Sequence, residues 1–221
     1  MNDAEITPPR HESDAPQLGV DGRVLEGMVS TRDADGTVRL SPMGPIVDQQ
    51  IHRLVMRPFR GSTTYANLTR SRQGVFHVVD DVLLIAQSAI GAPDPTPPTH
   101  VGSSIGFDIL DDACRWFAFV LEEVDDSQQR AVMYGRIVAH GEQRPFFGFN
   151  RAMHAVLEAA ILATRVDFID ANQLSTELRR LAPIVQKTGA AVEHRAFELL
   201  VDYVDRRLAM DAVDHVRKGV S

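Results

Sequence analysis

The stretch that decides the fold reads Arg57-Pro58-Phe59-Arg60-Gly61-Ser62-Thr63-Thr64-Tyr65-Ala66-Asn67-Leu68. It follows an apolar, alternating run at residues 51–56, which predicts a strand. It continues into residues 65–72, which contain no helix breaker and predict a short helix. The motif therefore lies where a strand ends and a helix begins.

Two functions are open for this junction. Hydroxyl side chains at the start of a helix satisfy its free backbone N–H groups, so an ordinary cap beside surface arginines explains the residues. The same N–H groups and the helix dipole also attract an anion such as phosphate, and an arginine at the strand end can add a bidentate contact. Three successive hydroxyl residues between Arg57, Arg60 and Asn67 favour the anion site, although the spacing alone does not decide.

Composition bounds the class of protein. The chain has 221 residues, is 44% hydrophobic and 24% charged, and fits one domain with an appendage or two small domains. A net charge of -7 argues against a nucleic-acid binder. The single cysteine, Cys114, lies at the start of an apolar run, so we expect a buried thiol rather than a nucleophile. No stretch has the length of a membrane span and the first residues lack a signal peptide, so we expect a cytoplasmic protein with no membrane partner.

The first part of the chain predicts a flexible tail followed by strands. Residues 1–21 are rich in proline and acidic residues and form the expected tail. A hairpin is predicted, with Pro42-Met43-Gly44-Pro45 breaking its second strand in an irregular turn. Asp80 and Asp81 are placed to cap a helix that runs to Ile90 and stops at Gly91. The expected strands lie at residues 24–31, 37–41, 51–56, 74–79, 114–124 and 131–139, with a proline-rich loop at 92–99. This pattern predicts a small closed or nearly closed antiparallel barrel.

Helical periodicity replaces the strand pattern after Pro145. Residues 149–165 form an amphipathic helix, with Asn150 as its N-cap and Phe149 as a hydrophobic staple. A second helix is expected at 173–187, kinked or ended by Pro183, and a third at 190–217. The expected organisation is a tail at 1–21, a barrel domain at 22–148, and a helical region at 149–221 packed on the barrel or on a second subunit.

Several catalytic signals are missing. The chain has no Gly-rich dinucleotide fingerprint, no phosphate-binding loop, no metalloprotease helix and no serine elbow. Its histidines have no ligand spacing, so we expect no metal site. The acidic residues at 122–126 are expected to form a solvated turn. Chemistry by a bound cofactor is therefore favoured over chemistry by side chains alone.

Five motifs carry a resemblance to a known family. They are Leu25-Glu26-Gly27-Met28-Val29-Ser30-Thr31, Ser41-Pro42-Met43-Gly44-Pro45, Arg57-Pro58-Phe59 with Ser62-Thr63-Thr64-Tyr65-Ala66-Asn67-Leu68, Gly74-Val75-Phe76-His77-Val78, and Phe149-Asn150-Arg151-Ala152 with Glu158-Ala159-Ala160-Ile161 and Thr164-Arg165. Their order resembles the DUF447 family, which is similar to FMN-binding split-barrel, flavin-reductase-like proteins. The resemblance covers residues 24–217 and implies an α+β protein, with an antiparallel split β-barrel followed by a C-terminal helical region.

The resemblance also implies FMN in a groove at a homodimer interface. Carried over by residue, it places Ser62, Thr63 and Thr64 on the phosphate with Arg57 as the counter-charge. Asn67 would hold the phosphate or the ribityl chain. Three further residues are implied at the ring, Ser41, Met43 and Gly44, although Met43 is equally a core residue. Arg151 would reach a neighbouring subunit's phosphate or, alternatively, cap its own helix with Asn150.

Two functions follow from this resemblance. The first is an FMN-dependent oxidoreductase with NAD(P)H as the electron donor and an unknown acceptor, for which a pterin-related compound is one implied class. The second is a flavin-binding protein without turnover, such as a carrier, a sensor or a dimeric scaffold. A barrel that has lost its cofactor site is the third alternative.

Overall fold

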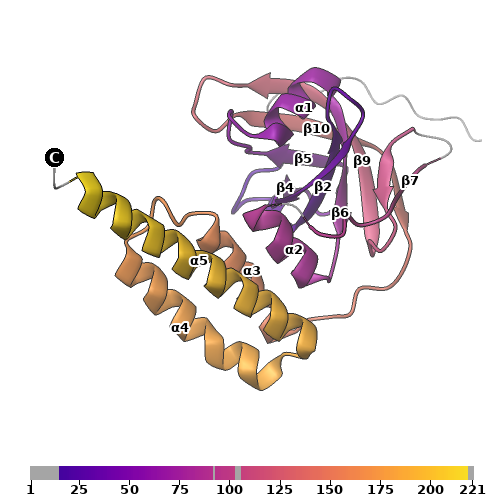
Figure 1. Cartoon of the computed structure of the whole chain (residues 1–221). Helices are drawn as coiled ribbons and strands as arrows, with labels where there is room; N and C mark the ends of the chain where they lie inside the picture. The colour runs from indigo at the N-terminus through magenta and orange to yellow at the C-terminus, as the bar shows by residue number, and fades with distance from the viewer. Residues whose placement is uncertain (1–14, 92, 103–105, 219–221) are drawn as a thin grey trace, which may run out of the picture.

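The strands in the described part of the chain belong to two antiparallel sheets. The strands are β1 (Arg23–Val24), β2 (Gly27–Arg32), β3 (Val38–Met43), β4 (Ile46–Val47), β5 (Arg53–Met56), β6 (Gln73–Val78), β7 (Thr99–Val101), β8 (Asp108–Leu110), β9 (Arg115–Asp125) and β10 (Val132–Glu142). Eight of them form one sheet in the order β1-β4-β5-β10-β9-β6-β2-β3, while β7 pairs with β8. The computed structural model describes residues 15–91, 93–102 and 106–218. Figure 1 shows the large sheet curled on itself.

Five helices accompany the sheets within the described residues. They are α1 (Thr63–Ser71), α2 (Val82–Ile90), α3 (Arg151–Ala163), α4 (Ala171–Thr188) and α5 (Ala191–Lys218). In Figure 1, α1 lies at one end of the curled sheet, and α2 lies between the sheet and the group formed by α3, α4 and α5. The helices after residue 150 therefore pack on the first half of the chain through α2.

Strand β2 connects two hydrophobic cores. Successive side chains of a strand point to opposite faces. Met28 accordingly packs among residues of α2 and the C-terminal helices, whereas Val29 packs inside the curled sheet with Leu54, Phe76 and Phe119. Both faces of β2 are buried, which makes it a central element of the fold.

Strand β3 differs from the prediction. Pro42 and Met43 were expected to break the strand, yet β3 runs through Met43, and Pro42 pairs with Met28 of β2. Proline is tolerated here because β3 is the last strand of the sheet, where a missing N–H need not cost a hydrogen bond.

The caps of the helices are mostly as predicted. Asp81 accepts from the N–H groups of Leu83 and Leu84, and Asn150 caps α3. Phe149 was expected to pack as a hydrophobic staple, but the residue is 95% exposed. Its ring lies nearly perpendicular to that of His154, with 6.0 Å between the ring centroids.

Pro183 was expected to kink or end its helix, but α4 continues through it. Leu178 and Val185 are both buried in the same core, so packing holds the helix on either side of the proline. Tertiary contacts thus outweigh the local cost of a proline in a helix.

The expected flexible tail also differs in part. Residues 1–14 lie outside the described residues. Residues 15–21 form a turn in which the carbonyl of Gln17 accepts from the N–H groups of Val20, Asp21 and Gly22. This turn lies against Ile46, since a Cβ on Gly22 would come within 2.6 Å of that side chain.

An ion pair fixes the connection between β10 and α3. Arg144 donates to both carboxylate oxygens of Asp80, at 2.9 and 2.5 Å, and the N–H of Phe147 donates to Asp80 at 2.9 Å. The hydrogen bonds from Arg144 lower the pKa of Asp80 to about 2. Cys114 is buried beside this pair, as predicted for a structural thiol, and burial raises its pKa to about 11.

Replacing Asp80 with asparagine is expected to lower the free energy of unfolding by about 2 kcal/mol at neutral pH. The unfolded carboxyl takes up a proton near pH 4 and the folded one near pH 2, so this contribution is complete above pH 4 and is lost as the pH falls to 2. Urea unfolding of both proteins from pH 7 down to pH 2 measures it. A difference that stays constant between pH 4 and pH 2 would contradict the assignment.

Candidate functional site

The junction between β5 and α1 begins with a true helix cap. The Ser62 hydroxyl accepts from the N–H of Tyr65 at 3.2 Å and donates to the carbonyl of Phe59 at 2.8 Å. Helix α1 therefore starts at Thr63, two residues before the predicted start. Both roles of the Ser62 hydroxyl are taken, so the capping alternative describes this residue.

The next two hydroxyls have different surroundings. Thr64 is buried, and its hydroxyl donates to the Ser41 hydroxyl at 2.8 Å, which ties α1 to β3. Thr63 is exposed. Within the described part of the chain, no group accepts from the backbone N–H of either threonine. The helix start thus presents two free donors.

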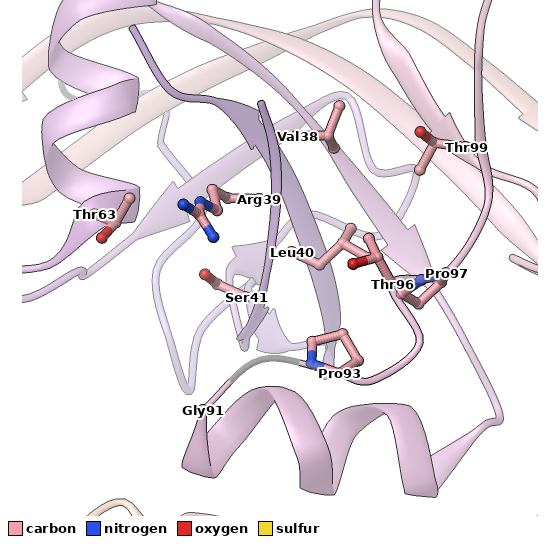
Figure 2. A pocket seen from close by; sticks show the side chains of 10 residues that line it. All are labelled: Val38, Arg39, Leu40, Ser41, Thr63, Gly91, Pro93, Thr96, Pro97 and Thr99. Carbon is pink, nitrogen blue, oxygen red and sulfur yellow. The ribbon is translucent and has the colours of Figure 1, made fainter. Parts of the chain in front are cut away.

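A pocket of about 350 Å³ opens beside this helix start. One wall comes from β3 and the first residue of α1, and the other from the segment that follows α2 (Figure 2). The lining residues are Val38, Arg39, Leu40, Ser41, Thr63, Gly91, Pro93, Thr96, Pro97 and Thr99. The structure thus brings together Ser41 and Thr63, which lie 22 positions apart in the sequence.

Arg39 is the residue of this pocket that the sequence analysis missed. Its side chain extends toward the side of the pocket on which Ser41 and Thr63 lie (Figure 2). The signal was available in part, since Arg39 and Ser41 are two positions apart on a predicted strand and so share a face. What the sequence did not indicate is that this face of β3 lies beside α1.

Asn67 lies behind the pocket rather than in it. It is buried, and its side-chain nitrogen donates to the hydroxyl of Thr31 at 3.1 Å and to the carboxylate of Asp33 at 2.9 Å. Asp33 in turn accepts from Arg39 at 2.6 Å. The hydrogen bond from Asn67, followed by that from Arg39, lowers the pKa of Asp33 and keeps the carboxylate ionised.

The remaining predicted residues lie apart from this pocket. Arg57 lines a second hollow, of about 530 Å³, with residues 15–18 and Tyr134. Met43 packs against the core inside the sheet, which is the alternative predicted for it. Arg151 is exposed at the first position of α3, after the Asn150 cap.

Gly44 lies against an acidic side chain. A Cβ at this position would come within 2.7 Å of the Glu26 carboxylate, so the absence of a side chain lets Glu26 approach. Burial, and then the negative charge of Glu158, raises the pKa of Glu26.

Metal and membrane sites are not indicated by the residues that the structure describes. No group of three or more His, Cys, Asp or Glu residues there could hold a metal ion. None of the helices within the described ranges is long and apolar enough to cross a membrane.

Two protein-family models match the sequence of this chain. The family model described as the N-terminal domain of a protein of unknown function, DUF447, matches residues 25–144, and a second DUF447 model matches residues 150–202. The chain belongs to the DUF447 family. The resemblance noted in the sequence is thereby confirmed.

One solved structure supports the same fold, and others are less similar. A DUF447 protein from Methanosarcina mazei, described as FMN-bound, is 23% identical with a TM-score of 0.73, over 84% of this chain and 97% of that one. The styrene monooxygenase flavin reductase from Pseudomonas putida is 15% identical with a TM-score of 0.46, over 55% of this chain and 79% of that one. An FMN-binding protein from Thermus thermophilus is 17% identical with a TM-score of 0.47, over 62% of this chain and 81% of that one. Among curated proteins none matches this DUF447 chain. The predicted fold class, an α+β split barrel followed by helices, is confirmed.

Proposed function

We propose that this DUF447 protein binds FMN in the pocket between β3, α1 and the segment after α2. The observation that carries the proposal is the meeting of Arg39, Ser41 and Thr63 at one pocket, beside two free backbone donors of a helix start. Cationic and hydroxyl donors at a helix N-terminus suit a phosphate. Val38 and Leu40 point to the other face of β3, toward the prolines, and this apolar side of the pocket suits the remainder of a flavin (Figure 2). The pocket has the size of a small-molecule site. A family member described as FMN-bound adds support.

The residues of the pocket fit distinct parts of that cofactor. Arg39 and Thr63 would hold its phosphate, Thr64 would contribute its backbone N–H, and Ser41 would be oriented by its hydrogen bond with Thr64. When bound, a flavin accepts and passes on a hydride or electrons. Among the described residues that line the pocket none is histidine, aspartate or glutamate, so we propose that these residues bind and orient the cofactor rather than act as an acid or base.

We further propose that the protein is an NAD(P)H-linked oxidoreductase that acts as a cytoplasmic homodimer. The resemblance of the sequence motifs to flavin-reductase-like proteins supports the activity and the dimer, and the free thiol of Cys114 fits a reducing compartment such as the cytoplasm. Anaerobic addition of NADH or NADPH to the flavin-loaded protein should bleach the flavin absorbance. Flavin that is bound but never bleached would favour the alternative, a flavin-binding protein without turnover. Sedimentation analysis tests the dimer.

Filling the pocket tests where flavin binds. Thr96 is an exposed wall residue, so Thr96→Trp should fold normally and occupy the pocket with its indole ring. We expect this variant to lose saturable FMN uptake, measured by quenching of flavin fluorescence. Thr69→Trp is the matched control, because Thr69 is exposed on α1 and does not line the pocket. Normal uptake by Thr96→Trp would place the flavin elsewhere, and no uptake by the unmodified protein would overturn the proposal.

A further inference from the structure

Arg39 is held by a chain of polar contacts that starts inside the protein. Asn67, which is 4% exposed, binds Asp33, and Asp33 binds the Nε of Arg39 at 2.6 Å. Thr31 on β2 accepts the second hydrogen bond from Asn67. Helix α1 and the hairpin of β2 and β3 therefore jointly set the position of one exposed guanidinium group.

This arrangement leaves the two Nη groups of the Arg39 guanidinium free for a ligand. Arginine has five N–H donors, and Asp33 uses only the one on Nε. Among residues 15–91, 93–102 and 106–218, none accepts from Nη1 or Nη2 of Arg39. These two groups form the fork that binds two oxygens of a phosphate at once. Figure 2 shows the fork on the side of the pocket that also carries Thr63.

The free donors, rather than the net charge, favour a phosphate over a neutral ligand. Asp33 and Asp35 both act on Arg39 and offset its charge, so selectivity depends on the hydrogen bonds that the ligand makes. A phosphomonoester gains two charge-assisted hydrogen bonds, and it also meets the free N–H groups of Thr63 and Thr64. Arg57, the arginine predicted for this role, lies in the other hollow.

We propose that Arg39, positioned by Asp33 and Asn67, is the residue that makes this pocket select a phosphomonoester flavin over one without phosphate. This inference rests on the proposed binding of FMN, and it concerns selectivity rather than flavin binding itself. Riboflavin carries the same ring and ribityl chain as FMN but no phosphate. The ratio of their two dissociation constants therefore isolates the contribution of the phosphate site.

Arg39→Gln is the direct test, with both dissociation constants measured by fluorescence titration. We expect FMN affinity to fall by about 10- to 100-fold, as for a lost pair of charge-assisted hydrogen bonds, while riboflavin affinity changes by less than about twofold. Arg136→Gln is the matched control. Arg136 also lies on a strand, is 49% exposed against 51% for Arg39, and binds Glu122 through its Nε at 2.8 Å. Arg136 does not line the pocket, so the ratio of the two dissociation constants in Arg136→Gln should equal that of the unmodified protein.

A double-mutant cycle tests the positioning role of Asn67. If Asn67 acts through Arg39, Asn67→Ala should reduce the preference for FMN, and the double variant should be no worse than Arg39→Gln alone. A merely structural role would weaken both flavins equally. Should Asn67→Ala fail to fold, Asp33→Asn replaces it in the same cycle, because Asp33 is the contact between Asn67 and Arg39. Arg39→Lys tests the fork separately. It keeps the charge without the fork, and an intermediate ratio is expected.

The outcomes separate this inference from the proposed function. Equal affinity of the unmodified protein for FMN and riboflavin would overturn the inference while leaving flavin binding intact. Loss of the preference in Arg57→Gln but not in Arg39→Gln would also overturn it. Failure of the unmodified protein to bind either flavin would instead remove the proposed function.

Discussion

Replacing Gly27 with alanine is expected to lower the free energy of unfolding by about 3 kcal/mol or more. A Cβ on Gly27 would lie 2.2 Å from the carbonyl oxygen of His77 and 2.9 Å from the ring of Phe76. The first contact is with backbone of the neighbouring strand β6, so no side-chain rotation relieves it. Phe76 is fully buried in the core and cannot move aside without disturbing its neighbours.

Urea unfolding followed by circular dichroism measures this effect, with Gly61→Ala as the control. No atom lies within 4 Å of a Cβ on Gly61, so its replacement should change the free energy of unfolding by less than about 0.5 kcal/mol. Should Gly27→Ala come within about 1 kcal/mol of the unmodified protein, β2 and β6 do not approach as described.

Acidification from pH 6.5 to pH 4 is expected to remove about 3 kcal/mol of stability through His77 alone. His77 is fully buried, its Nε2 accepts from the N–H of Leu110 at 3.0 Å, and its Nδ1 faces the carbonyl of Met28 at 3.3 Å. The neutral ring satisfies both partners, whereas a proton on Nε2 would break the bond to Leu110. Burial lowers the pKa of His77 to about 4.

The two pKa values of His77, unfolded and folded, decide whether acid raises or lowers the free energy of unfolding. The unfolded ring takes up its proton below about pH 6.5 and the folded ring only below about pH 4, so lowering the pH between these values favours unfolding. His77→Gln, which retains an acceptor for Leu110, should lack this component. Its free energy of unfolding at several pH values between 7 and 4 provides the comparison. Parallel curves for the two proteins would refute a neutral, buried His77.

Local signals predicted much of this fold. The caps at Asp81 and Asn150, the first hairpin and the long C-terminal helix all depend on residues close together in the sequence, and the structure has them. Pro42 does not break its strand and Pro183 does not end its helix, because the cost of a proline depends on distant partners. One lies at an edge that only the sheet order creates, and the other in a helix held by packing on both sides.

The candidate site was harder to predict because it is formed by elements that lie far apart in the sequence. Ser41 and Thr63 were chosen from motifs, and the fold brings them to one pocket. Arg57 was predicted from its motif and from the family resemblance, and the structure places it in the second hollow. Proposing Arg39 requires knowing that the edge strand β3 lies beside α1, as the hydrogen bond between Thr64 and Ser41 shows. Contacts between elements distant in the sequence decide such choices.

The proline-rich segment at residues 93–98 affects the thermodynamics of ligand binding in the pocket. It contains four prolines within six positions, Pro93, Pro95, Pro97 and Pro98, and two of them line the pocket. Each ring fixes one backbone dihedral, so this wall has little conformational entropy left to lose. A ligand that enters therefore meets a surface already ordered, and more of its contact energy is retained as affinity.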